Sequence, residues 1–321
     1  MTNKKVYISD SLSPYENLAA EKHILSHLGV GEVALFLWRN ADTIVIGKNQ
    51  NVWQECKVSE FLESGGTIAR RLSGGGAVYH DAGNLNFSFL YADGAWSTEE
   101  GLSVIAKALL PFGIEATVSG RNDILAGGAK FSGNAFYSVN GEAVKGVCHH
   151  GCILISADMS RLAGFLTVSK EKLESKGVRS VSSRVVNLGS LSDGITVDSL
   201  AFSLSRAFSE SEEMITVDMR DPEIKKDAEF FASSEWIFGR KIDFTHTLSQ
   251  RLSFGEIRLC FKVSGGVVEE CRVYSDSMEP SLAPTLEKAF KGKMFSYDAL
   301  CRAIDSIPDA DEIKELLYRN I

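Results

Sequence analysis

The sequence lacks the features that mark membrane-spanning, disulfide-stabilised and repeat proteins. No apolar run approaches the roughly 18 to 20 residues that a membrane-spanning helix needs, and only a short apolar stretch follows the N-terminus. The six cysteines are scattered along the chain, so we expect reduced thiols and no disulfide framework. Low-complexity tracts and internal repeats are absent. These absences favour a cytoplasmic globular protein without a membrane partner.

Common signals for nucleic-acid and nucleotide binding are missing as well. A formal net charge of -8 argues against broad nucleic-acid binding, which depends on clustered Lys and Arg. The chain has glycine-rich segments at residues 70–81 and 127–130. Neither fits the Walker pattern G-x-x-x-x-G-K-[ST], and the dinucleotide pattern G-x-G-x-x-G has no match. Any bound nucleotide would therefore be held in another way.

A glycine-rich segment is present at residues 70–81 (RRLSGGGAVYHD). Its consecutive glycines expose backbone N–H groups, and Arg70 and Arg71 add two permanent cations. Such a loop suits close approach to an anion, whereas a plain tight turn would use the same glycines for its backbone geometry. From these residues alone, both interpretations stay open.

Local patterns predict a mixed α/β fold. Ser13 as N-cap, Pro14 and Glu16 begin an amphipathic helix. Ser97 and Glu100 form a capping box for another helix. Strands are expected at residues 33–38, 43–46, 84–89, 123–125, 131–135 and 146–155, and helices dominate from 159 to about 238. Because strands and helices do not alternate strictly, we expect a mixed sheet flanked by helices.

The C-terminal part of the chain has a pattern of its own. Residues 257–263 alternate between apolar and polar side chains, a turn follows at 264–266, and a second strand at 267–274 leads into helices. We therefore expect one domain that ends near residue 245, followed by a small two-layer unit.

A lysine among small residues is the second candidate for chemistry. Lys130 lies in residues 127–135 (GGAKFSGNA), where small neighbours would let a ligand approach its ammonium group. Most lysines, however, are solvated surface residues. Just upstream, residues 121–123 (RND) suit either a ligand contact or an Asn-Asp turn.

The third candidate is residues 148–152 (CHHGC). On a strand, Cys148, His150 and Cys152 would share one face, with His149 on the other. Zinc would need a fourth ligand that the sequence does not show. A cysteine beside a histidine also suits nucleophilic acyl transfer. Core or pocket-lining side chains remain the simplest interpretation of the two cysteines.

Taken together, these motifs closely resemble the two-domain bacterial lipoate-protein ligases of the lipoate/biotin ligase superfamily. The matching segments are residues 37–40 (LWRN), 46–51 (IGKNQN), 70–81, 121–123, 130–135, 149–151 (HHG), 176–178 (KGV), 183–188 (SRVVNL), 254–255 (FG) and 274–277 (YSDS). They occur in the family's order and extend over nearly the whole chain.

The resemblance implies a fold and a division into domains. The family has a mixed central sheet flanked by helices, similar to class II synthetases and biotin ligases, followed by a small α+β accessory domain. We therefore expect residues 1–245 to form the catalytic domain that binds lipoate and its adenylate, and residues 246–321 to form the accessory C-terminal domain.

The resemblance also implies a two-step ligase reaction. Lipoate or octanoate and ATP form an acyl-adenylate and pyrophosphate, and a lysine of an acceptor domain then takes the acyl group while AMP leaves. The expected acceptors are dehydrogenase E2 subunits and the glycine-cleavage H protein. ATP implies Mg²⁺, whose ligands the sequence does not identify. We expect a monomer.

Positions that match the family supply the expected site. Lys130 is the expected catalytic cation, because joining a carboxylate to an α-phosphate brings two anions together. The positions expected to bind ATP are Arg71, Gly76, Ala77, Val78, Tyr79, Asn122, Asp123 and Lys130. The positions expected to bind lipoate are Trp38, Arg70, Ser73, Gly75, Lys130 and His150. Trp38 is chosen because the lipoyl tail is apolar.

Two departures from the family pattern leave alternatives. Cys148 and Cys152 stand where the ligases usually carry an aromatic residue and a threonine, and related octanoyl and lipoyl transferases use a cysteine nucleophile. The alternative function is thus a cysteine-dependent acyltransferase that uses Cys148 or Cys152 without ATP. A third possible function is that of a non-catalytic module that holds lipoyl or biotinyl domains. The presence of Lys130 argues against this function. Ser182 replaces an arginine of many relatives, which affects only the contacts of its loop.

Overall fold

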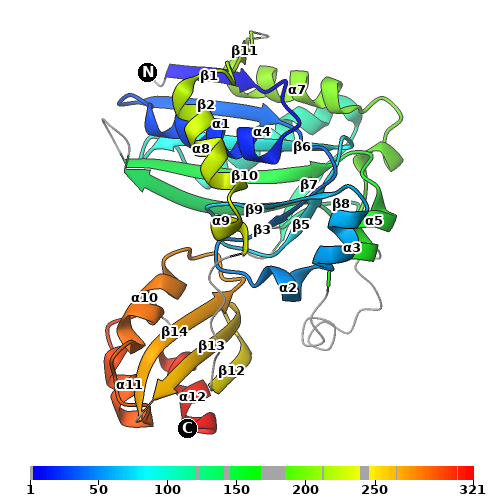
Figure 1. Ribbon diagram of the computed structural model, residues 1–321. Coiled ribbons are helices and arrows are strands. Elements are labelled where there is room, and N and C mark those ends of the chain that lie inside the picture. The colour runs from blue at the N-terminus through cyan, green and yellow to red at the C-terminus, as the bar shows by residue number, and fades with distance from the viewer. Residues whose placement is uncertain are drawn as a thin grey trace.

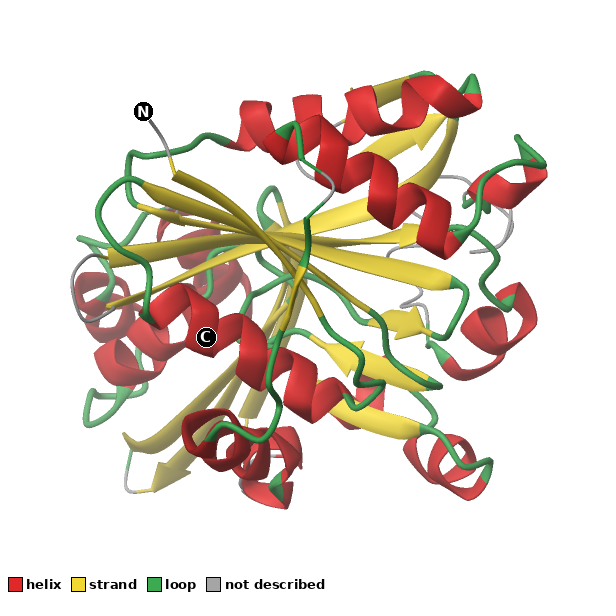
Figure 2. Cartoon of the chain, turned by 90° about the horizontal axis from the view of Figure 1, so that it is seen from above, coloured by secondary structure: helices red, strands yellow, loops and turns green. Residues whose placement is uncertain are grey.

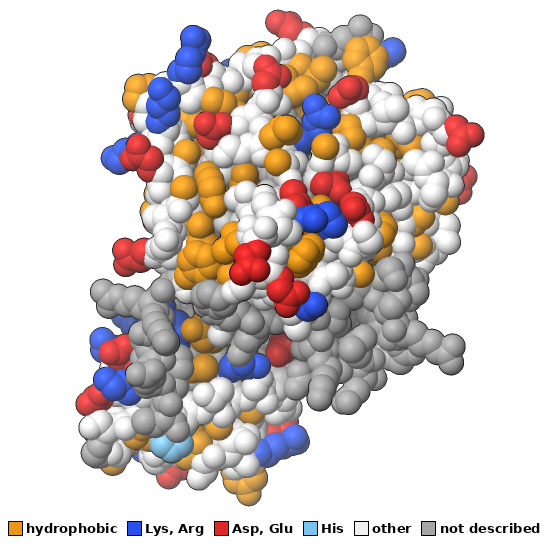
Figure 3. Space-filling model, turned by 45° about the vertical axis from the view of Figure 1, so that its right-hand side comes forward, with side chains coloured by type: hydrophobic (Ala, Val, Ile, Leu, Met, Phe, Trp, Pro, Cys, Tyr) orange, Lys and Arg blue, Asp and Glu red, His pale blue; other side chains and the backbone are white. Residues whose placement is uncertain are grey.

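The computed structural model describes residues 3–119, 123–140, 145–167, 185–211, 213–238, 246–264, 266–308 and 310–321. Over these ranges the chain builds a large mixed sheet with helices on it, a small sheet beside it and a separate C-terminal sheet with its own helices (Figure 1). None of the described helices combines the length and apolar character needed to cross a bilayer. On the face drawn in Figure 3, acidic and basic side chains are interspersed across the described surface.

The large sheet contains eight described strands in the order β11-β1-β2-β6-β10-β9-β8-β7. Their bounds are β1 Asn3–Ile8, β2 Glu32–Trp38, β6 Asn84–Ala92, β7 Ala116–Ser119, β8 Asp123–Ala126, β9 Ala129–Asn140, β10 Lys145–Leu154 and β11 Ile215–Thr216. β1 pairs in parallel with β2 and β11, and the other described pairs of this sheet are antiparallel. The predicted mixed sheet is therefore confirmed.

Helices cover both faces of the large sheet (Figure 2). On one face α1 (Pro14–Ser26) packs against α8 (Pro222–Ala232), and on the other α4 (Thr98–Leu109) packs against α7 (Val197–Ser209). Successive side chains of β2 point to opposite faces of the large sheet, so this strand contributes to the apolar core on each face. Leu35 and Leu37 join the core under α4 and α7, whereas Phe36 and Trp38 join the core under α1.

Local sequence signals fixed the helix starts. The Ser13 side chain accepts a hydrogen bond from the backbone N–H of Glu16, and Ser97 and Glu100 form the predicted capping box of α4. A short 3-10 helix, η1 (Leu110–Phe112), follows α4 and contains Pro111. Both predicted N-termini are confirmed, because a cap needs only residues that are close in sequence.

A small sheet in the order β4-β3-β5 holds the glycine-rich segment. Its strands are β3 Thr43–Ile46, β4 Thr67–Arg70 and β5 Val78–His80. The helices α2 (Val52–Glu55), α3 (Val58–Glu63) and α5 (Met159–Phe165) supply side chains to its core. The predicted strand at residues 43–46 is confirmed, and the glycine-rich segment runs from the end of β4 into β5.

The C-terminal part forms a second two-layer unit. It contains β12 His246–Leu252, β13 Gly255–Ser264, β14 Val267–Ser275, α10 Leu282–Phe290, α11 Tyr297–Ala303 and α12 Ala310–Asn320. A separate apolar core joins this sheet to its helices. Strand β12 was not among the predicted strands. The predicted domain boundary at residue 245 falls outside the described residues and stays a prediction.

Two short elements complete the described part of the chain. These are η2 Leu188–Ser190 and α9 Ser234–Phe238. α9 follows α8 and lies against β4, where its backbone reaches the glycine-rich segment. The predicted helical character between residues 159 and 238 is thus met by α5, α7, α8 and α9, apart from the short strand β11 and the residues that are not described.

Candidate active site at the glycine-rich segment

Arg70 anchors the start of the glycine-rich segment. Its guanidinium donates hydrogen bonds to the backbone carbonyls of Gly47, Lys48 and Gln50, and of Trp236 and Ile237 in α9. Burial lowers the pKa of Arg70 to about 10, so the group is still a cation at neutral pH. These carbonyls belong to two segments that are distant from Arg70 in the sequence. Arg70 therefore joins three segments of the chain.

Arg71 is buried inside the glycine loop itself. Its Nε donates to Ser73 Oγ over 2.9 Å, and its terminal nitrogens donate to the carbonyls of Val45, Gly74 and Gly76 over 2.7 to 3.1 Å. Burial lowers its pKa to about 10, which leaves it protonated at neutral pH. The loop is thus wrapped around a fixed positive charge.

The glycines are required by close backbone approach. Gly75 has a φ of 86°, in the left-handed region that favours glycine. A Cβ added to Gly74 would lie 2.2 Å from the carbonyl oxygen of Ser277, whereas one added to Gly76 would meet no atom within 4 Å. The N–H of Gly75 also donates to the Ser277 carbonyl over 3.1 Å. The C-terminal unit therefore docks directly on this loop.

We expect Gly74→Ala to loosen the contact between the loop and residue Ser277. The added methyl group cannot be accommodated without a backbone shift, so the Gly75 to Ser277 hydrogen bond should be lost, at a cost of about 1 to 3 kcal/mol in stability. Hydrogen exchange of the Gly75 amide measures this loss. Gly76→Ala is the matched control and should leave the exchange unchanged. Equal protection in Gly74→Ala would contradict the contact.

A cavity with a volume of about 150 Å³ lies between the glycine loop and the large sheet. Its lining residues are Leu18, Trp38, Val45, Arg71, Gly75, Gly76, Ala77, Val78, His80, Asn86, Lys130, Gly133, Asn134, Ala135, His150, Gly151 and Cys152. They come from α1, the small sheet with its glycine-rich loop, and four strands of the large sheet (β2, β6, β9 and β10), so only the folded chain assembles this lining. The cavity combines apolar side chains with two cationic groups and bare glycine backbone.

Lys130 is held at the edge of the cavity by Asp123. Its Nζ lies 2.7 Å from Asp123 Oδ1, and about a third of each side chain is exposed. The position is crowded on the β9 side, because a Cβ added to Gly133 would lie 2.9 Å from Nζ. The backbone carbonyl of Lys130 also accepts a hydrogen bond from the N–H of Val186. Lys130 is thus a positioned cation that solvent or a ligand can reach.

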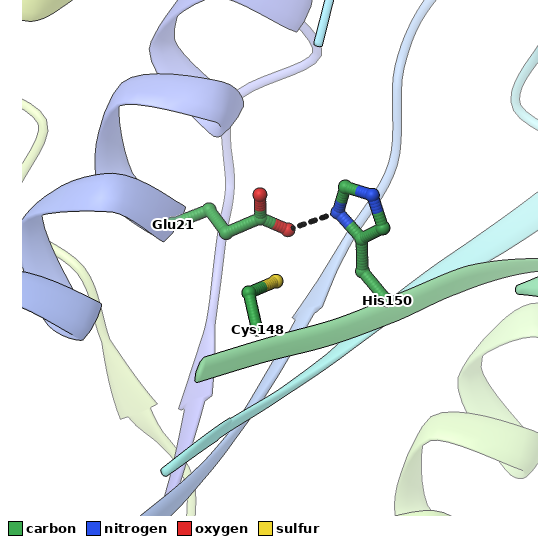
Figure 4. A group of neighbouring side chains, drawn as sticks. All are labelled: Glu21, Cys148 and His150. Atoms are coloured by element: carbon green, nitrogen blue, oxygen red, sulfur yellow. Dashed lines mark hydrogen bonds and ion pairs between the residues drawn. The ribbon is translucent and has the colours of Figure 1, made fainter. Parts of the chain in front are cut away.

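A buried carboxylate lies behind the cavity wall. Glu21 on α1 accepts hydrogen bonds from His150 Nδ1 over 2.8 Å, from Tyr137 Oη over 3.0 Å and from the Ser88 hydroxyl. Figure 4 shows Glu21 and His150 pointing toward one another from α1 and β10, with the Cys148 thiol beside them. Burial alone would raise the pKa of Glu21, but the charge of His150 and these hydrogen bonds lower it below 4.5. Glu21 is therefore an ionised buried group.

The carboxylate is connected to the glycine loop through two side chains. His150 Nε2 lies 2.7 Å from Ser73 Oγ, and Ser73 Oγ also accepts the hydrogen bond from Arg71. Nδ1 of His150 faces Glu21 and Nε2 faces Ser73, so both ring nitrogens are hydrogen-bonded. The chain of bonds fixes the ring of His150 at the cavity.

The two cysteines do not have the character of nucleophiles. Burial, followed by the Glu21 charge, raises the pKa of Cys148 well above its usual range. Burial also raises the pKa of Cys152 to about 12, and Asn84 donates a hydrogen bond to its sulfur. Cys148, His150 and Cys152 do share one face of β10, as predicted, while His149 packs with Phe87, Phe89 and Phe136 on the other. Both thiols are thus largely protonated at neutral pH.

The structure brings most of the predicted site residues together. Those that line the cavity are Trp38, Arg71, Gly75, Gly76, Ala77, Val78, Lys130 and His150. Ser73 lies directly behind the wall, bonded to His150 and Arg71, and Asp123 lies beside Lys130. Two others lie away from the cavity: Arg70 is occupied with carbonyl groups, and Tyr79 is buried in the core of the small sheet. Asn122 lies outside the described residues, as do residues 121, 176–178 and 182–184.

Sequence reasoning missed Glu21, together with the cavity-lining Asn86 and Asn134. One signal for Glu21 was available, because it follows Leu18 by three residues and precedes Leu25 by four. This spacing places a carboxylate on the apolar face of the predicted helix. A charge at such a position needs partners inside the protein. The partners themselves could not be read from the sequence.

Comparison with known proteins gives matches along the whole chain. Residues 13–209 match the family of the lipoyl protein ligase A/B catalytic domain, and residues 241–317 match that of the bacterial lipoate protein ligase C-terminus. Lipoate-protein ligase A of Bdellovibrio bacteriovorus is 36% identical to this chain over 341 residues, covering 100% of this chain and 99% of the relative.

Solved structures are similar as well. The crystal structure of P. falciparum LipL1 in complex with lipoate has a TM-score of 0.87 at 28% identity, over 99% of this chain and 100% of that chain. A crystal structure of lipoate-protein ligase A bound with ATP has a TM-score of 0.60 at 22% identity, over 74% of this chain and 99% of that chain. At 22% identity, the second similarity shows only that the two proteins share a fold.

Proposed function

Since this chain belongs to the lipoate-protein ligases, and is a ligase, we propose that it activates lipoate or octanoate with ATP and transfers the acyl group to an acceptor lysine. The observation that carries this proposal is the composition of the cavity. Its lining combines apolar side chains with Lys130, Arg71 and glycine backbone. This combination suits an acyl chain whose carboxylate must meet a phosphate.

The apolar and the polar lining residues support separate roles in binding. Trp38, Leu18 and Val45 offer apolar surface to the acyl chain. Gly75 and Gly76 leave the backbone of the loop open to the cavity, and Arg71 supplies a buried positive charge behind it. This side suits the phosphates of ATP, the ligand named for one of the structurally similar ligases.

Lys130 is proposed as the catalytic cation of the first step. An oxygen of the acyl carboxylate attacks the α-phosphorus, a bond from carboxylate to phosphorus forms, and the bond to pyrophosphate breaks. The ammonium of Lys130 offsets the repulsion of the two anions, and Asp123 holds it in place before they bind. In the second step the amine of the acceptor lysine attacks the acyl carbonyl, loses one proton and releases AMP.

Magnesium is expected with ATP. Mg²⁺ prefers oxygen ligands and takes one or two carboxylates together with phosphate oxygens. Asp123 fits this preference, because it offers a carboxylate beside Lys130 at the edge of the cavity. Bound there, the ion would neutralise phosphate charge, and Lys130 would be free to face the reacting groups.

The test is an assay of both half-reactions with the full chain. Pyrophosphate should be released from ATP only when lipoate or octanoate is present. An intact-mass increase by one acyl group should then appear on an acceptor from a panel of E2 lipoyl domains and H protein. Release of pyrophosphate without a change in any acceptor would limit the proposal to the first step. Acyl transfer without ATP would overturn it.

The acceptor preference, the monomeric state and the cytoplasmic location stay predictions.

We expect Cys148→Ser and Cys152→Ser to keep ATP-dependent ligation within about one order of magnitude, because both thiols are protonated. Loss of a true nucleophile would instead cost about 10⁶-fold. Mass spectrometry of the protein with an acyl donor should find no acyl-cysteine. An acyl adduct on either cysteine would favour the acyltransferase alternative.

A further inference from the structure

A cluster of two histidines and one glutamate lies away from the cavity, where the C-terminal end of α1 meets the first turn of α8. His23 lies in the last turn of α1, His27 is the C-cap residue of this helix, and Glu223 lies in the first turn of α8. Nδ1 of His23, Nε2 of His27 and a carboxylate oxygen of Glu223 all lie within 4.8 Å of one another. The two helices lie side by side on the outside of the large sheet (Figure 1). The cluster is therefore made of surface groups from two elements.

The two distances from the Glu223 carboxylate to the histidine nitrogens match those between neighbouring ligands of a tetrahedral cation. Glu223 Oε2 lies 3.3 Å from His23 Nδ1 and 3.4 Å from His27 Nε2. Zinc binds nitrogen and oxygen ligands at roughly 2.0 to 2.1 Å, so neighbouring ligands of a tetrahedral ion are about 3.3 to 3.4 Å apart. Ordinary hydrogen bonds from nitrogen to oxygen are shorter, with a usual length of about 2.9 Å.

Hydrogen bonds and ion pairs around the cluster orient its side chains. His27 Nδ1 lies 2.8 Å from the backbone carbonyl of His23, which fixes the proton on Nδ1 and turns the lone pair of Nε2 toward Glu223. Metal-binding histidines in proteins are commonly oriented by such a carbonyl. Nδ1 of His23 is buried and makes no hydrogen bond within the described part of the chain.

We propose that His23, His27 and Glu223 bind one divalent transition-metal ion of the Zn²⁺ class. Two imidazoles and one carboxylate are a ligand set that Zn²⁺ accepts, and a water would complete the tetrahedron. Space for the water is present, since the side chains of His27 and Glu223 are 37% and 64% exposed. Mg²⁺ and Ca²⁺ are not expected, because they prefer oxygen ligands.

The ion would join α1 to α8 at the N-terminal end of α8. α1 carries Leu18 in the cavity wall and Glu21 behind it, and α8 continues into α9, whose carbonyls hold Arg70. Binding should therefore stabilise the folded state by an amount that increases with the concentration of free metal. The proposal concerns a site outside the ligase cavity and does not depend on the reaction assigned to it.

The experiment is a titration of the full chain, free of any affinity tag and treated with a chelator, with ZnCl₂ and separately with MgCl₂. We expect one equivalent of Zn²⁺ to bind and to raise the unfolding midpoint, and Mg²⁺ to do neither. His27→Gln and Glu223→Gln should each weaken Zn²⁺ binding at least about tenfold and reduce the shift of the midpoint.

Matched controls separate this site from other metal-binding groups. Glu229→Gln makes the same change at an exposed position of α8, and His246→Gln removes a histidine of the C-terminal unit. Both should bind Zn²⁺ like the unmodified chain. Affinity that is unchanged in His27→Gln and Glu223→Gln would overturn the proposal. Affinity that falls in Cys148→Ser alone would place the ion at the Glu21, Cys148 and His150 group and overturn it equally.

Discussion

Replacing Lys130 by alanine should reduce the release of pyrophosphate that depends on lipoate or octanoate by about 10³-fold or more, while the protein stays folded. The reason is electrostatic. Without the ammonium, the carboxylate and the α-phosphate lose the cation that offsets their repulsion, because the terminal nitrogens of Arg71, the other cation of the lining, are occupied by backbone carbonyls. About a third of the Lys130 side chain is exposed, so its removal leaves no closed cavity.

The matched control for this variant is Lys145→Ala. Lys145 also stands on a strand of the large sheet and also pairs with an aspartate, since its Nζ lies 3.1 Å from Asp93. It should keep the activity of the unmodified chain. Circular dichroism checks the fold of both variants. Activity in Lys130→Ala that equals the activity of Lys145→Ala would contradict the catalytic role.

The second large effect is expected for Glu21→Gln. The change conserves volume but removes a buried charge from a group of three hydrogen-bond donors, which should cost about 3 kcal/mol of stability. The ring of His150 would lose its orienting partner, and with it the bond to Ser73. We therefore expect kcat/KM for the acyl substrate to fall about 10²-fold. Urea unfolding and steady-state kinetics measure the two effects.

The same residue gives a pH dependence. A carboxylate with a pKa lower in the folded than in the unfolded chain stabilises the folded state above its unfolded pKa, and this stabilisation is lost as the pH falls through the folded pKa. The pKa of Glu21 is lowered below 4.5. The free energy of unfolding should thus fall more steeply below pH 4.5 in the unmodified chain than in Glu21→Gln. The exposed Glu229→Gln should follow the unmodified chain. Identical profiles for all three proteins would contradict the assignment.

The neighbouring arginines show where prediction from sequence stops. Arg70 and Arg71 have the same charge and adjacent positions, and both were predicted to meet a ligand. At the end of β4 they take different partners, because successive side chains of an extended chain point in opposite directions. Arg71 turns into the cavity wall, whereas Arg70 turns to carbonyls of α9, more than 160 residues along the chain.

Features that depend on neighbouring residues could be predicted from the amino-acid sequence. The N-caps at Ser13 and Ser97 and the alternating strand at β13 all follow from patterns within a few residues. The ordered motifs also determined the family, which the match along the whole chain confirmed.

The environments that side chains share depend on how distant parts of the chain pack. Glu21 became a buried anion because α1 lies against β6, β9 and β10, whose Ser88, Tyr137 and His150 donate to it. Likewise, His23 and His27 gained Glu223 as a neighbour because α8 packs beside α1. Pairing of strands and helices that are distant in sequence sets these contacts, and a local pattern holds no information about the partner that packing will supply.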